Sequence, residues 1–153
     1  MIEAVLDTRA ARKAFADIDR KIDRAAMYAT REVGRVVKRE ATKRAPVYKP
    51  AGHAGRVTRK STKAHLAATT RAEQMSGPAI PGLLKLSVKS SRALRGAGGT
   101  YSLKVGPRGA RVHLYAQKAE QRHGFMAAAN EAAQARAAEV WNRSFAKTLA
   151  KYK

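Results

Sequence analysis

The distribution of charge along this chain limits how it can fold. Of its 153 residues, 32 are Lys or Arg and 11 are Asp or Glu, which gives a formal net charge of +21. Residues 46–112 contain thirteen basic residues and a single acid, Glu73, whereas residues 1–45 and 113–153 mix both signs. Self-repulsion disfavours packing so basic a segment on itself. We therefore expect the middle of the chain to lie against something negative, either nucleic acid or an acidic protein surface.

The composition predicts one domain, residues 1–153, with a thin hydrophobic core. Hydrophobic residues make up 44% of the chain, but aromatic residues are only 6% and much of the remainder is Ala. We therefore expect partner molecules to contribute to its stability. The chain has no Cys, which excludes disulfides and thiolate chemistry.

The N-terminal residues lack the basic start and apolar run of a signal peptide. No segment approaches the roughly 20 apolar residues of a membrane-spanning helix. We expect a protein that is made and used without export and does not associate with a membrane.

Apolar residues near the N-terminus recur at steps of three and four, which is typical of one face of a helix. They are Phe15, Ile18, Ile22, Ala25, Ala29, Val33, Val36 and Val37. Pro46 ends the pattern, because the residue before a proline avoids the helical region. The sequence thus predicts a long amphipathic helix over 8–45. Gly34 inside it either weakens the helix or marks a close contact.

Residues 47–82 are predicted to form an extended basic arm, because Gly and Pro interrupt this stretch repeatedly. A short helix over Lys63–Gln74 is an alternative for part of it. The basic residues that we expect to contact a partner are Lys49, Arg56, Arg59, Lys60, Lys63 and Arg71.

A small antiparallel sheet is predicted over 83–115. Leu84–Lys89 and Thr100–Val105 show the period-two alternation of half-buried strands, and the Gly-rich link between them favours a hairpin. Arg111–Tyr115 is a candidate third strand. An apolar stripe then predicts a helix over 125–150, in which Trp141 is interpreted as a core residue. The predicted fold class is α+β, with this C-terminal helix packed on the sheet.

No catalytic, cofactor or metal site is predicted. Zinc sites need three or four converging ligands, and none of the four histidines lies three or four residues from another. A Ser–His–acid triad needs an acid, and the strand region has none apart from the distant Glu120. Glu120 lies between Lys118 and Arg122 and is interpreted as a local ion pair. The glycines do not have the spacing of a phosphate-binding loop. We expect a protein that is not an enzyme.

Three interpretations of the basic arm remain. It is a solvated segment, a non-specific DNA contact through Lys and Arg, or a docking element for an acidic protein surface. Only Tyr48 and Tyr101 are aromatic between residues 46 and 112, which is poor for stacking on single strands.

The order of several short motifs resembles the neck, or tail-completion, family of long-tailed bacteriophages. The long helix ends in Ala45-Pro46-Val47, a Gly-Leu-Leu-Lys-Leu-Ser-Val segment starts at Gly82, and Val105-Gly106-Pro107 follows. Tyr115-Ala116, Glu120 and Gly124-Phe125-Met126 then precede the last helix. In this family the Ala-Pro-Val end leads almost directly to the Gly-x-Leu strand, whereas here residues 48–81 intervene. The residues that carry the resemblance are Pro46, Gly82, Leu84, Ser87, Gly106, Pro107, Tyr115, Glu120, Gly124 and Phe125.

The resemblance implies a structural virion protein of the phage head–tail junction, assembled in the host cytoplasm. It implies a homo-oligomeric ring, six- or twelve-fold, between portal-side adaptor or head-completion proteins and the tail terminator or tail tube proteins. Non-specific contact with packaged DNA would fit the charge. The alternative function is a basic protein that coats nucleic acid, histone-like or ribosome-associated.

Overall fold

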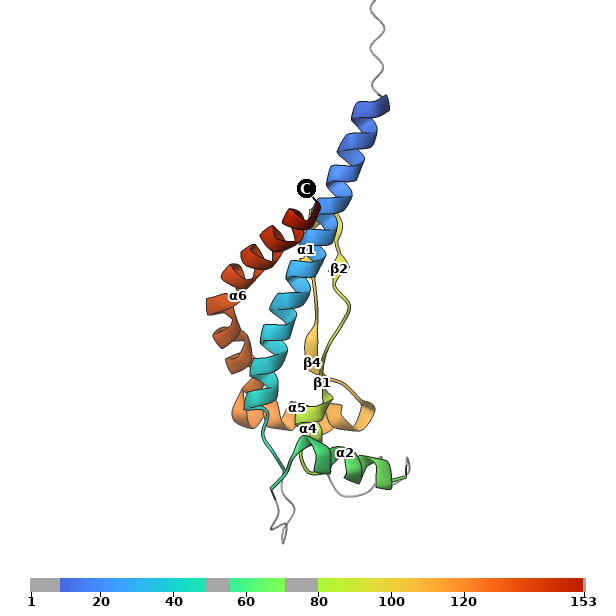
Figure 1. The fold of residues 1–153 in the computed structure, drawn as a ribbon. Coiled ribbons are helices and arrows are strands. Elements are labelled where there is room, and N and C mark those ends of the chain that lie inside the picture. The colour runs from blue at the N-terminus through green and yellow to red at the C-terminus, as the bar shows by residue number, and fades with distance from the viewer. Residues whose placement is uncertain (1–8, 49–55, 71–79, 153) are drawn as a thin grey trace, which may run out of the picture.

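A computed structural model of the protein describes residues 9–48, 56–70 and 80–152. The predicted fold class is confirmed: a long N-terminal helix, a small antiparallel hairpin and a C-terminal helix form an α+β fold (Figure 1). The elements are α1 (Arg9–Arg44), α2 (Arg59–Ala68), α4 (Leu83–Ser87), β1 (Val88–Ser90), β2 (Leu94–Arg95), η1 (Ala97–Gly99), β3 (Tyr101–Ser102), β4 (Val105–Pro107), α5 (Ala110–His123), α6 (Phe125–Leu149) and η2 (Ala150–Tyr152).

Helices α1 and α6 pack along each other through small side chains. Ala25, Ala26 and Ala29 of α1 are buried, as are Ala129 and Ala133 of α6. Alanine lets helix axes approach closely, so the Ala-rich composition builds a helix pair. Figure 1 shows the strands beside α1 on the side away from α6. Helix α6 therefore packs chiefly on α1, whereas the apolar stripe had been interpreted as packing on the sheet.

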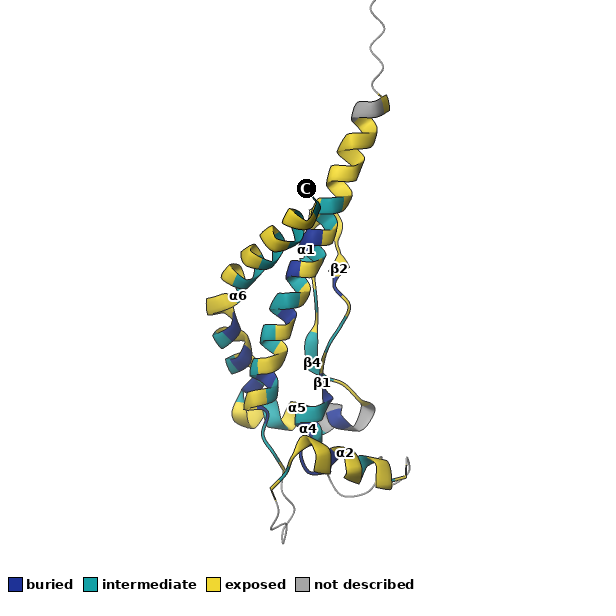
Figure 2. Ribbon diagram, viewed as in Figure 1, coloured by how far each residue is buried: buried dark blue, intermediate teal, exposed yellow. Residues whose placement is uncertain are grey.

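The first twelve residues of α1 project beyond the rest of the fold. They are exposed wherever their side chains are described (Figure 2). The body of the molecule begins near Lys21, whose ammonium donates to the Tyr152 carbonyl oxygen at 3.4 Å. Phe15 and Ile18 on the projecting part remain 68% and 49% exposed. The apolar stripe predicted for this helix is thus buried only in its later part.

The hairpin is divided into two short ladders. Val88 pairs with Pro107 in the first, and Leu94 pairs with Ser102 in the second. Between the ladders, residues 91–93 oppose only residues 103–104, which is the arrangement of a β-bulge. The predicted strand Thr100–Val105 is accordingly shared between β3 and β4.

The hairpin is fastened to α1 at two places. The Tyr101 hydroxyl donates to the Asp23 carboxylate, which also pairs with Arg95. Further along, a Cβ built on Gly34 would lie 2.5 Å from Cδ2 of Leu103. Gly34 therefore marks a close contact, which is one of the two roles expected for it.

Two predicted strands are helical, and these predictions were wrong. Most of Leu84–Lys89 belongs to α4, where Leu84 and Ser87 are both buried at a helical spacing of three. Arg111–Tyr115 lies in α5, whose Val112 is buried and whose Tyr115 packs against the core at the same spacing. Segments this short fit both the strand period of two and the helical period of about 3.6, and packing on the core decided in favour of the helix.

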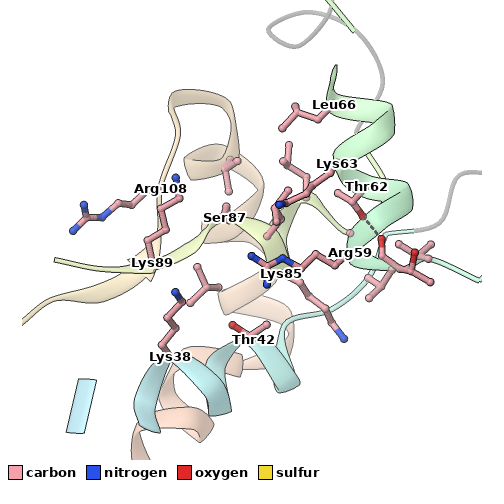
Figure 3. A pocket seen from close by; sticks show the side chains of 18 residues that line it. Lys38, Thr42, Arg59, Thr62, Lys63, Leu66, Lys85, Ser87, Lys89 and Arg108 are labelled. Carbon is pink, nitrogen blue, oxygen red and sulfur yellow. Dashed lines mark hydrogen bonds between the residues drawn. The ribbon is translucent and has the colours of Figure 1, made fainter. Parts of the chain in front are cut away.

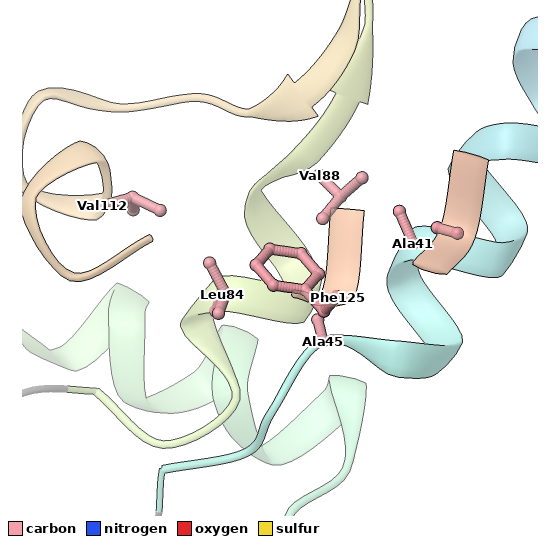
Figure 4. Packing of buried hydrophobic residues seen from close by; sticks show 7 residues of the cluster. Ala41, Ala45, Leu84, Val88, Val112 and Phe125 are labelled. Carbon is pink, nitrogen blue, oxygen red and sulfur yellow. The ribbon is translucent and has the colours of Figure 1, made fainter. Parts of the chain in front are cut away.

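The core lies where α1, α4, β1, α5 and α6 meet (Figure 4). Phe125 and Val88 are its largest fully buried side chains. Trp141 is only partly buried and stacks on Phe145, with ring centroids 4.8 Å apart. The interpretation of Trp141 as a core residue was wrong, because the second half of α6 has α1 on one side only.

Candidate binding groove

A groove of about 620 Å³ opens between the end of α1, helix α2, helix α4 and the start of the hairpin (Figure 3). Its rim carries basic side chains from five parts of the chain, and its walls are apolar. The basic residues are Lys38, Arg59, Lys63, Lys85, Lys89 and Arg108. The apolar residues are Val47, Val57, Leu66, Leu83, Leu86, Val88 and Val112. We call this feature the basic groove.

Helix α2 forms one wall of the basic groove, and local sequence fixes where it begins. Thr58 and Ser61 make a capping box, in which each side chain bonds the backbone N–H of the other residue, at 3.1 and 2.9 Å. The helix turns Arg59 and Lys63 toward the groove. The prediction of an extended arm is thus corrected at Arg59–Ala68, where α2 forms. The short helix considered as an alternative over Lys63–Gln74 overlaps α2 but was placed too late in the chain.

A buried hydroxyl anchors α2 to the rest of the fold. Thr62 is 3% exposed, and its Oγ1 donates to the Pro81 carbonyl oxygen at 2.9 Å. Gly82, the residue after Pro81, has a φ of +72° and is the N-cap of α4. A Cβ there would lie 2.6 Å from Thr62 Oγ1 and 2.8 Å from a Val57 methyl group. Only glycine therefore allows α2 to approach α4 so closely.

The opposite rim is held by the junction between α4 and the strands. The Ser87 hydroxyl donates to the Leu84 carbonyl oxygen at 2.7 Å, and the Ser87 carbonyl accepts from the Arg108 backbone N–H at 3.0 Å. These bonds place Arg108 beside Lys89, at the end of β4 and the middle of β1. Two cations far apart in sequence thus share one edge of the groove.

The basic groove is electrostatically one-sided. None of the 18 residues that line it is acidic. Five ion pairs connect described residues, and none of them includes a cation of the groove. Six positive charges around a concave surface raise the local concentration of anions. The groove is therefore suited to a ligand that brings both negative charge and apolar surface.

The structure distributes the predicted arm residues unevenly. Arg59 and Lys63 line the groove, whereas Arg56 and Lys60 are exposed and do not line it. Lys49 and Arg71 lie outside the described residues. Four further groove cations were not predicted from the sequence: Lys38, Lys85, Lys89 and Arg108. For Lys85 and Lys89, the alternation of Lys with apolar residues after Leu84 was a visible signal.

The residues behind the family resemblance gather in and around the core. Leu84, Ser87 and Phe125 are buried, and Tyr115 packs beside them. Gly82 and Gly124 adopt positive φ at helix starts. Pro46 and Tyr115 line a smaller cavity of about 380 Å³, and Gly106 and Pro107 lie in β4.

Glu120 has a role other than the one predicted for it. Its two carboxylate oxygens accept hydrogen bonds from the backbone N–H groups of Met126 and Ala127, at 2.8 and 3.0 Å. It therefore caps the first turn of α6, where unpaired N–H groups and the helix dipole favour a carboxylate. The ion-pair interpretation was wrong, since no ion pair of Glu120 occurs among the described residues.

Within residues 9–48, 56–70 and 80–152, no group of three or more metal-ligating side chains comes together. None of the helices in these ranges is both long and apolar enough to cross a bilayer. Comparisons of the chain with protein-family models, with curated proteins and with solved structures found no match.

Proposed function

We propose that this protein is a structural component of a bacteriophage head–tail junction, in which several copies form a ring between head-side proteins and the tail. The proposal rests on the order of short motifs from Pro46 to Phe125 that resembles the neck family. It implies a virion location and no catalysis.

The structural observation that supports the assembly of several copies is the exposed apolar face at the start of α1. Phe15, Ile18 and Ile22 lie on one helical face and are 68%, 49% and 42% exposed. Apolar surface gathered on one face of an element favours association with another protein. Such a surface, on a helix that extends about 18 Å past the body at the helical rise per residue, suits a subunit that is completed by its neighbours.

A mutant phage tests this function directly. We expect the coding gene to lie between head genes and tail genes, and a nonsense mutation in it to leave filled heads and finished tails unjoined. Electron microscopy of lysates would show both, and supplying the wild-type gene on a plasmid should restore joined particles. Normal infectious particles from the mutant would contradict the proposal.

A second candidate function is non-specific binding of nucleic acid. It is favoured by the six cations of the basic groove, none of which pairs with a described acid. Binding that rests on Lys and Arg should be independent of sequence and should weaken steeply with salt. Gel shifts with unrelated duplexes across a salt series measure both properties. Strong preference for one sequence at moderate salt would instead indicate a regulator.

A further inference from the structure

We propose that the basic groove of each subunit binds residues 1–8 of a second copy of the chain. This inference rests on the homo-oligomeric assembly of the proposed function and names the contact that would build it. The ligand is a short segment with acidic and apolar side chains.

The chemistry of the groove selects such a ligand over a nucleic-acid backbone. Seven apolar side chains line it, from Val47 to Val112, and they gain from burying apolar groups. No lining residue is aromatic, so bases would find no stacking surface. A peptide that carries carboxylates and aliphatic side chains satisfies both the rim and the walls.

Residues 1–8 match these requirements in sequence. The segment Met-Ile-Glu-Ala-Val-Leu-Asp-Thr contains the acids Glu3 and Asp7, the aliphatic residues Ile2, Val5 and Leu6, and no basic residue. It is the one stretch of eight residues in this very basic chain that carries two acids and no base. Its charge is therefore opposite to that of the groove.

The segment cannot reach the groove of its own subunit. Lys38 at the groove lies 29 positions after Arg9 on the straight helix α1 (Figure 1), which is about 44 Å along the axis. Eight residues span at most about 29 Å even when fully extended. The groove that receives residues 1–8 therefore belongs to another copy.

A contact of this kind joins unlike surfaces of two identical subunits. Repeated head to tail, it closes into a ring or continues as a filament. The exposed apolar stripe of Phe15 and Ile18 lies on the same projecting end, seven and ten positions after Thr8. That stripe would come close to the neighbour when the groove is filled, which adds apolar contact to the charge complementarity.

Two full-length variants test the contact. Variant one carries Lys85→Glu and Lys89→Glu in the groove, and variant two carries Glu3→Lys and Asp7→Lys in the segment. Each should weaken self-association at least about tenfold in analytical ultracentrifugation, because like charges then face each other. A matched control, Arg31→Glu with Arg92→Glu, makes the same charge change at exposed positions outside the groove and should stay within about twofold of wild type.

Mixing the variants gives the sharper result. Variant one keeps an intact segment and variant two keeps an intact groove, so the mixture should form dimers that cannot extend. Circular dichroism establishes that each variant is folded. A fluorescent peptide of residues 1–8 should also bind variant two and not variant one.

Several results would overturn the inference. One is that both variants associate as strongly as the wild type. If the wild type then still forms rings, the proposed function stands and only the groove contact is refuted. Another is loss of duplex binding in variant one with association intact, which would assign the groove to nucleic acid. A wild-type chain that stays monomeric at all concentrations would also refute it, and the mutant-phage experiment would then decide separately on the head–tail function.

Discussion

At the scale of single residues, Gly82 holds the wall of the basic groove in place. We expect Gly82→Ala to cost about 3 kcal/mol, because positive φ strains any side chain and the new methyl group overlaps Thr62 and Val57. Gly98 has a similar φ of +67° with open space around it, so Gly98→Ala isolates the strain, about 1 kcal/mol. Urea unfolding measures both, and trypsin should cut Gly82→Ala faster at Lys60 and Lys63. Equal costs for the two variants would show that the close approach of α2 is unimportant.

The phenol of Tyr101 is expected to lose its proton at a higher pH than an ordinary tyrosine. Its hydroxyl donates to the Asp23 carboxylate, and this bond, with desolvation, raises the pKa of Tyr101 above its ordinary value. A raised pKa stabilises the fold fully below about pH 10, the unfolded value, and the contribution is lost as pH rises through the folded value. Asp23→Asn should lower the pKa of Tyr101. The ultraviolet titration of wild type, with the Tyr101→Phe curve subtracted, gives this pKa, and no change in Asp23→Asn would refute the contact.

Glu120 shows how one carboxylate can start a helix. Glu120→Ala should destabilise the protein by about 1 kcal/mol, since two backbone N–H groups of α6 lose their acceptor. Glu120→Gln, which retains an acceptor oxygen, should cost less. Glu131 lies exposed on the same helix, so Glu131→Ala should stay within about 0.5 kcal/mol of wild type. Thermal unfolding compares the three, and a cost for Glu131→Ala equal to that for Glu120→Ala would argue against capping.

At the scale of elements, the two ends of α6 contribute differently. Phe125 is 2% exposed in the core, so Phe125→Ala should cost about 3–5 kcal/mol. Trp141 is partly exposed and its site can admit water, so Trp141→Ala should cost less, about 2 kcal/mol. Denaturant unfolding gives both values. A larger loss for Trp141→Ala would mean that the outer half of α6 is the true core.

Helix α1 serves two structural purposes along its length. Its later part supplies small residues to the seam with α6 and the close approach of Gly34 to the hairpin. Its first part contributes nothing to the hydrophobic cluster of the core. Substitutions there should therefore change association without changing the fold.

At the scale of the whole molecule, the first part of α1 should affect the association of subunits and not the fold of each subunit. Phe15→Ser with Ile18→Ser should leave circular dichroism unchanged and shift the protein toward monomer, since exposed apolar area that a neighbour would bury is removed. We expect association to weaken about tenfold, in line with two lost anchor side chains. Leu94→Ser is the control, because Leu94 is 60% exposed on the hairpin. Sedimentation that is unchanged by the Phe15 and Ile18 substitutions would refute this role.

Much of the fold was predictable from local pattern. The apolar repeat from Phe15 to Val37 predicted α1, Pro46 marked its end, and the stripe after Phe125 predicted α6. Long repeats of this kind identify a helix without knowledge of its surroundings. A hairpin with a Gly-rich turn was predicted, but its first strand begins only at Val88, and its bulge had no signal in the sequence.

Only the tertiary structure decided the rest. Leu84–Lys89 and Arg111–Tyr115 are too short for their period to be decisive. Both pack on the core around Phe125, and this burial made them helical. The basic groove likewise has no local signature, because Lys38, Lys63 and Arg108 come from distant parts of the chain. The sequence by itself determined how much positive charge the protein carries and which long segments are helices. Folding determined which charges converge, because convergence depends on contacts between elements and not on the order of neighbouring residues.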